Sequence, residues 1–328
     1  MPFILRRLLF YVVAAWVALT INFFIPRAMP GNAVQSVMSK FTNLQPAAYK
    51  ALQALLGVGH AGSIWSQYVS YLNDIFHFNF GTDVSQYPAS VSSLLAQTLP
   101  WTIILVGTAT VIAFLIGTGL GIVAGWRHGG SLDRVLPGLM FLQAIPYFFF
   151  ALILVDLLAI KTHVFPTGQG YDNGLIPGWH GDFIGSAIFH SLLPALTIVL
   201  TSIAGWMLQM RNVMITTIGE DYVIAAQAKG LPSRRVIFSY AARNALLPQL
   251  QGFGLAVGFV ISGALVMEIV FSYPGIGLLL LNAVTSNDYP LMQAIFLVIT
   301  FAVLIANLIV DMIIVFADPR ARTREATA

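Results

Sequence analysis

The chain has 328 residues, of which 58% are hydrophobic and only 9% are charged, and its formal net charge is +3. Soluble domains carry roughly 25% charged residues, and a mean hydropathy of +0.82 leaves too little polar surface to cover a water-soluble globule. A soluble globular protein is therefore excluded. The absence of cysteine excludes disulfides, cysteine-ligated metals and thiol chemistry.

Six apolar segments are long enough to cross a membrane, since a spanning helix needs about 20 mostly apolar residues. In chain order they cover residues 8–25, 99–126, 135–160, 188–214, 250–271 and 291–316. A signal peptide is the alternative interpretation of the first segment. Its apolar stretch is long for that role and residues 26–30 form a poor cleavage site, so we expect an uncleaved helix. The predicted fold class is an all-α, polytopic membrane protein.

The first long connection, residues 27–98, is predicted to lie outside and to contain an amphipathic helix. Its apolar residues recur at helical spacing: Trp65, Tyr68, Val69, Leu72 and Phe76. Further outer connections are expected at residues 161–187 and 272–290. One long inner connection remains, residues 215–249.

The distribution of Lys and Arg predicts the orientation, because these residues collect in cytoplasmic segments. Of the 16 basic residues, four fall in outer segments: Arg27, Lys40, Lys50 and Lys161. The other twelve fall in inner segments when the N-terminus is inside: Arg6, Arg7, Arg127, Arg134, Arg211, Lys229, Arg234, Arg235, Arg243, Arg320, Arg322 and Arg324. Both termini are therefore predicted to be cytoplasmic, which requires an even number of spans.

The inner connection is predicted to form two short helices joined by a sharp bend. Glu220 and Asp221 suit a first helical turn, where the helix dipole favours carboxylates, and the alanines at 225, 226 and 228 are strong helix formers. Gly230 suits a left-handed helix end, and Pro232 suits the first turn of a second helix. That helix is expected to break at Pro248. A plain, solvated basic loop is the alternative that composition alone would favour.

This inner connection resembles the EAA loop of type I ABC importer permeases, in their peptide (oligopeptide/dipeptide) branch. The resemblance extends in order over nearly the whole chain. The stretches that carry it are residues 3–9, 98–100, 133–135, 221–236, 243–248, 268–277, 288–290, 307–311 and 318–320. The resemblance implies the type I importer permease fold, a single transmembrane permease domain over residues 1–328, and a place in a bacterial plasma (inner) membrane.

In this family the loop docks into a cleft of an ATPase subunit, so residues 220–248 are expected to couple ATP hydrolysis to transport. Expected coupling residues are Glu220, Asp221, Ala225, Ala226, Lys229 and Gly230, with the small residues giving close packing and the charges giving orientation. Expected partners are a second homologous permease, two ATPase subunits and an outer substrate-binding protein, besides the lipid bilayer. ATP and Mg would bind to the ATPases, and this chain is expected to hold no cofactor, no metal and no catalytic residue.

Polar residues within the predicted spans are candidates for the transport pathway or gate, because a charge at the bilayer centre costs roughly 2.5–3.5 kcal/mol. They are Glu268, Gln143, Gln209, Asn307 and Asp311, the last two lying on one helix face. Helix–helix hydrogen bonding is the alternative role for each of them.

The expected substrate is a peptide, with an oligosaccharide or nickel as alternatives inside the same family. A stand-alone secondary transporter or channel, and an intramembrane enzyme, are the alternatives outside it. The first would need ion-coupling carboxylates near mid-membrane, but Asp156, Glu268 and Asp311 fall near span ends. The second would need a catalytic constellation in the spans, and none is found.

Overall fold

The structure is a computed structural model that describes residues 3–28, 63–83, 89–263 and 265–317. Side chains are described in these ranges except at 3–4, 26, 28, 257–263, 310 and 313–317. The described residues are almost all helical, and their only extended pairing is an isolated bridge between Thr82 and Ser90. The all-α prediction is confirmed. The predicted inner residues Arg320, Arg322 and Arg324 and the predicted outer residues Lys40 and Lys50 lie outside the described residues.

Contacts divide the chain into two compact units. Unit 1 comprises residues 1–102 and 274–304, and unit 2 comprises residues 103–273 and 305–328. Two long helices, α5 (Val91–Trp126) and α14 (Tyr289–Ala317), contribute residues to both units.

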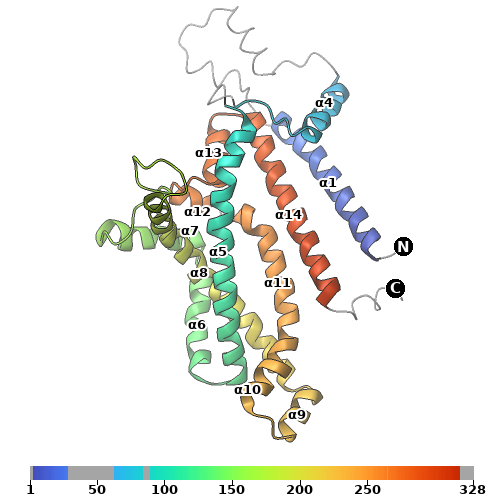
Figure 1. The fold of residues 1–328 in the computed structure, drawn as a ribbon, viewed down its shortest axis with the longest axis vertical. Helices are drawn as coiled ribbons and strands as arrows, with labels where there is room; N and C mark the ends of the chain where they lie inside the picture. Colours follow the sequence, from blue (N-terminus) through green and yellow to red (C-terminus); the bar gives the residue numbers. More distant parts are fainter. Residues whose placement is uncertain (1–2, 29–62, 84–88, 264, 318–328) are drawn as a thin grey trace, which may run out of the picture. The chain divides into compact units, whose positions relative to one another are not determined.

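Unit 1 contains α1 (Phe3–Ala28), α4 (Ile64–Phe76) and α13 (Ile276–Thr285). Helix α4 is the amphipathic helix predicted in the first long connection, and it lies across the C-terminal end of α1 (Figure 1). Helix α13 falls in a connection where the sequence predicted no helix. Its first N–H, that of Ile276, donates to Thr102 Oγ1 at 2.9 Å.

Unit 2 is built around α8 (Gly181–Ile218), which packs against α6 (Ser131–Ala144) and α11 (Ala242–Gly263). Between α6 and α8 lie α7 (Tyr147–Leu154) and the π-helical turn η1 (Val155–Lys161), and α12 (Leu265–Val270) follows α11. Between α8 and α11 lie the short elements α9 (Asp221–Ala228), α10 (Ser233–Arg235) and η2 (Val236–Ala241).

Four described helices are long and apolar enough to cross a membrane, within Leu5–Ile25, Val91–Trp126, Gly181–Ile218 and Tyr289–Ile309. They confirm four of the predicted spans as apolar helices. The predicted span at 250–271 falls on α11 and α12, whose junction at residue 264 is not described. The total of six spans and the cytoplasmic termini therefore stay predictions.

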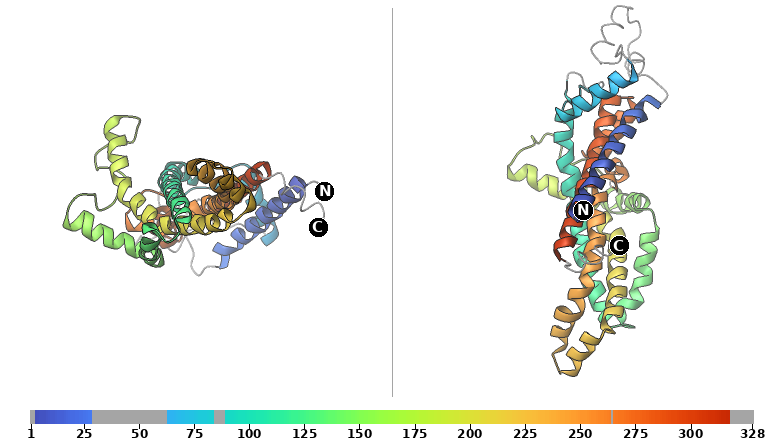
Figure 2. Two further views of the ribbon diagram at one scale, coloured as in Figure 1. Left: turned by 90° about the horizontal axis from the view of Figure 1, so that it is seen from below. Right: turned by 90° about the vertical axis from the view of Figure 1, so that its right-hand side faces the viewer.

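The predicted span at 135–160 is not one straight helix. Helices α6 and α7–η1 meet at an angle of 96° (Figure 2). Ile145 has an extended backbone with ψ 126°, and Pro146 follows it. Because proline disfavours the helical conformation of the residue before it, the extended backbone at Ile145 ends the helix and a new one starts in another direction.

The predicted break at Pro248 is wrong, because α11 continues through this proline to Gly263. The next residue, Gln249, is fully buried, and its Nε2 donates to Thr118 Oγ1 at 3.2 Å and to the Trp206 carbonyl at 3.0 Å. These bonds to α5 and α8 fix the helix at the point where proline removes one backbone hydrogen bond.

Candidate functional site: the α9–η2 hairpin

A helical hairpin, residues 219–241, reverses the chain between α8 and α11 (Figure 1). Helix α8 ends at Ile218, and Glu220 is extended, with φ −74° and ψ 142°, before α9 begins. Asp221 lies in the first turn of α9, where its carboxylate faces the positive end of the helix dipole.

Gly230 makes the bend that the sequence predicted. Its φ is +72°, in the left-handed region, and its N–H donates to the Gln227 carbonyl at 2.9 Å. The second helix starts at Ser233, and Pro232, which was expected in its first turn, is the extended residue immediately before it. The first short helix and the sharp bend are confirmed, but the second helix is not short, because α10, η2 and α11 follow one another without a break.

We expect Gly230→Ala to destabilise the hairpin by about 1 kcal/mol, because a non-glycine residue is strained at positive φ. A Cβ at this position would meet nothing within 4 Å, so backbone strain is the only source of the effect. Gly219→Ala is the matched control, since Gly219 has φ −78° and its added Cβ would make only an ordinary contact at 3.5 Å. Thermal unfolding in detergent should rank the two variants, and equal melting temperatures would contradict the prediction.

The hairpin is fixed to the rest of unit 2 by an apolar cluster, here called the seat. It comprises Ile122, Met210, Met214, Val223, Ala226, Val236, Ala241, Ala242 and Ala245. The seat joins α9 and η2 to the C-terminal half of α8 and to α5, and five of its nine members are wholly inaccessible to solvent. Close packing of this kind transmits a displacement instead of absorbing it.

The side of α9 away from the seat is exposed. It carries Asp221, Ile224, Ala225 and Ala228, while Glu220 and Lys229 are exposed at the two ends of the helix. Ala226 lies on the other side and is only 3% exposed. Its side chain therefore supports the hairpin from within, and the small exposed residues of the helix are Ala225 and Ala228.

A row of glycines lets α5 approach α8 closely behind the seat. A Cβ at Gly117, Gly121 or Gly125 would come within 2.4–2.6 Å of atoms of α8, including the Met207 carbonyl. The three glycines are four residues apart and so lie on one face of α5. The helix that these glycines meet cannot be deduced from their spacing alone.

An ion pair between Asp133 of α6 and Arg211 of α8 joins these two helices next to the seat, since Arg211 follows Met210 in the chain. Arg211 Nε donates to Asp133 Oδ1 at 2.7 Å and Nη2 donates to Oδ2 at 3.0 Å, and the Gly129 N–H also donates to Oδ2. The two side chains are only 18% and 13% exposed. The sequence did not predict this ion pair, because its two residues are 78 positions apart in the chain.

Two of the pathway candidates lie over glycines of neighbouring helices. If Gly205 of α8 carried a Cβ, that atom would lie 2.9 Å from the side-chain amide of Gln143 in α6. A Cβ added at Gly252 of α11 would likewise lie 3.0 Å from the side-chain amide of Gln209 in α8. Gln143 is exposed and Gln209 is half-buried. Since Gly205 and Gln209 are one turn apart on α8, the structure brings these two glutamines to adjacent levels of that helix.

The other pathway candidates lie on α12 and α14. Glu268 is completely buried in α12, next to the segment that carries Tyr273. On α14, Asn307 and Asp311 are half-buried, and Asn307 Oδ1 is enclosed without a hydrogen-bond partner among the described residues. Asp156, by contrast, pairs with Lys161 at 2.6 Å on the exposed surface of η1.

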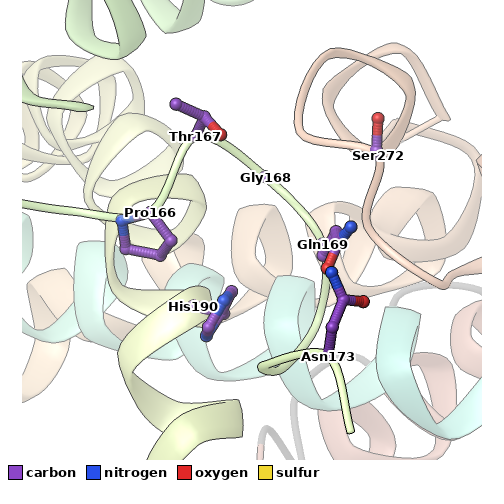
Figure 3. A pocket seen from close by; sticks show the side chains of 7 residues that line it. All are labelled: Pro166, Thr167, Gly168, Gln169, Asn173, His190 and Ser272. Atoms are coloured by element: carbon purple, nitrogen blue, oxygen red, sulfur yellow. The ribbon is translucent and has the colours of Figure 1, made fainter. Parts of the chain in front are cut away.

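Unit 2 also contains a polar pocket of about 430 Å³, which the sequence did not predict. Its lining comprises Pro166, Thr167, Gly168, Gln169, Asn173, His190 and Ser272 (Figure 3). The connection after η1 is fixed above it, because the Gln169 N–H donates to the Phe271 carbonyl at 2.8 Å. Nearby, Tyr273 hydrogen-bonds Ser191 at 2.9 Å, and burial, with the charge of Glu268, raises the pKa of Tyr273 to about 12.

Several apolar membrane-length helices and a helical hairpin between α8 and α11 define the chain as a multi-pass membrane protein. Residues 117–323 match the family of binding-protein-dependent transport system inner membrane components. The chain belongs to this family, whose members are permeases of the inner membrane.

Relatives match over almost the full chain. The oligopeptide transport system permease protein AppB of Bacillus subtilis (strain 168) is 30% identical over 97% of this chain and 98% of its own. The dipeptide transport system permease protein DppB of Escherichia coli (strain K12) is 30% identical over 99% and 100%. The di/tripeptide transport system permease protein DppB of Pseudomonas aeruginosa (strain UCBPP-PA14) is 29% identical over 98% and 99%.

Proposed function

We propose that this chain is one permease subunit of an ATP-driven importer of peptides. It forms half of the pathway together with a second homologous permease, while two ATPase subunits and an outer binding protein complete the machine. Peptides are the substrate class because full-length relatives carry oligopeptide, dipeptide and di/tripeptide transport in their names.

We assign the coupling to the ATPase subunits to the hairpin. The observation that carries this assignment is that the side of α9 away from the seat is exposed. Ala225 and Ala228 leave the backbone open to a partner, and Glu220, Asp221 and Lys229 surround them with charge. A single exposed ion pair is worth only about 0–1 kcal/mol, so packing against the alanines contributes more than charge. The seat beneath then passes the partner's movement to α8 and α5.

We expect Ala225→Trp to reduce ATP-driven peptide uptake roughly tenfold or more, because the indole would fill the space that the ATPase needs. The chain itself should fold normally, since residue 225 is exposed and outside the seat. The measurement is uptake of a labelled peptide into proteoliposomes that contain the whole co-expressed importer.

Ala225→Ser is the control of nearly unchanged size, and it should transport like the natural chain. A tryptophan variant that assembles with its ATPases and transports at the normal rate would refute the assignment of the hairpin. Loss of uptake together with loss of ATPase from the purified assembly would support it.

A further inference from the structure

Helix α4 has a broad apolar face, and only part of this face packs against α1. At 100° per residue, Tyr68, Tyr71 and Ile75 fall within about 60° of one another. This face packs on α1, where the Tyr68 and Tyr71 rings lie 5.2 and 5.4 Å from the Phe23 ring. A second apolar group, turned by about 100° from the first, does not pack there.

That second group, here called the free stripe, comprises Trp65, Val69 and Phe76. These residues lie within about 40° of one another on the helix, and their exposed fractions are 71%, 49% and 75%. Ser66, Ser70 and His77 follow on the next side of α4, so the free stripe lies between the contact with α1 and a polar side.

The contacts between α4 and α1 fix the level of the free stripe along the membrane-spanning helix. The Tyr68 hydroxyl bonds Thr20 at 2.7 Å, and Asn22 donates to the Tyr71 hydroxyl at 3.1 Å. The apolar span of α1 runs to Ile25, so Thr20 lies about 7.5 Å inside its end at 1.5 Å per residue. Helix α4 therefore packs against the last turns of the apolar span of α1.

The neighbouring groups are those of a membrane interface. Ile21 and Phe24 of α1, at the same level, are 54% and 50% exposed and continue the apolar surface of the span. Arg27, just beyond, lies with its guanidinium 3.6 Å from the Phe23 ring centre and donates to Gln67 of α4. Tryptophan and phenylalanine on one face of a helix, with hydroxyls and a cation at its edge, are typical of helices lying in the interfacial layer.

We infer that α4 lies in the plane of the bilayer surface, with Trp65, Val69 and Phe76 in contact with lipid. Burial of the free stripe among acyl chains and headgroups removes from water the apolar area that α1 leaves open. The helix then holds the C-terminal end of α1 at a fixed depth. This inference rests on the membrane character of the chain and not on the proposed coupling or substrate.

Site-directed spin labelling tests the inference directly, because the chain has no natural cysteine. Val69→Cys and Ser70→Cys place labels on adjacent residues at one level but on different sides of α4. The assembled importer is placed in lipid nanodiscs, and collision of each label with oxygen, which dissolves in the bilayer, is compared with collision with a water-soluble nickel chelate. We expect the oxygen-to-nickel ratio to be several-fold higher at residue 69 than at residue 70.

Ile21→Cys, on the exposed face of the span, gives the reference ratio for lipid contact. Equal ratios at residues 69 and 70 would overturn the inference, since the free stripe would then have no more contact with lipid than the polar side of α4. Protection of residue 69 from both reagents would also overturn it, since another protein surface would then cover the stripe. Normal elution of the labelled assemblies shows that these outcomes do not come from unfolding.

Discussion

Gly121→Ala is expected to destabilise the chain by about 1–3 kcal/mol, although the same change in an ordinary helix stabilises it by about 0.5–1 kcal/mol. The added Cβ would lie 2.6 Å from the Met207 carbonyl oxygen and 2.6 Å from Met210 Cβ. Neither is the end of a flexible side chain, so α5 and α8 must move apart. Because Met210 belongs to the seat, this movement should also loosen the hairpin.

Gly119→Ala is the control, two residues away on the same helix. Gly119 is exposed, and a Cβ there would meet nothing within 4 Å. We expect it to leave the melting temperature unchanged or slightly raised, while Gly121→Ala lowers both the melting temperature and the folded yield in detergent. Equal behaviour of the two variants would show that α5 and α8 do not pack as closely as the structure places them.

Local features of the sequence were sufficient to predict the hairpin. Gly230 and Pro232 each restrict the backbone in one way, and an acidic first turn marks the start of α9 wherever the chain lies. The apolar spans were predictable for a similar reason, since the thickness of the bilayer sets the length of an apolar helix directly.

Proline was a less certain guide because its effect depends on its surroundings. At Pro146 the helix ends and turns by 96°, whereas at Pro248 it continues with Gln249 bound to two other helices. The two prolines look alike in the sequence. Only tertiary contacts decide whether the lost backbone hydrogen bond is compensated by neighbouring helices.

The parts of the site that need distant residues were not predictable. Ala225 and Ala226 are adjacent and chemically identical, yet Ala226 is inside the seat and Ala225 is exposed. What distinguishes them is the rotation of α9 about its own axis relative to α8, which the sequence does not show. The spacing of the glycines of α5 does not show which helix packs against them. The role of Gln143 and Gln209 likewise depends on which glycine each one faces.

Asp133→Asn is expected to lower the free energy of unfolding by about 3 kcal/mol, because it leaves the Arg211 guanidinium largely enclosed without its counter-charge. Both oxygens of Asp133 are engaged, by Arg211 and by the Gly129 N–H, so the amide cannot replace the carboxylate at every bond. The pair holds α6 beside the end of α8 that carries the hairpin. Its loss should therefore also lower ATP-driven uptake in the assembled importer.

Asp156→Asn is the matched control, because the Lys161–Asp156 pair is as short, at 2.6 Å, but its side chains are 62% and 50% exposed. Its removal should change stability by less than about 1 kcal/mol. The double variant Asp133→Asn with Arg211→Gln removes both charges and should regain part of the loss, since no uncompensated charge remains. If Asp133→Asn and Asp156→Asn unfold alike, enclosure of the ion pair does not contribute to holding α6 on α8, and the connection comes from apolar contacts such as those of Leu136 and Met207.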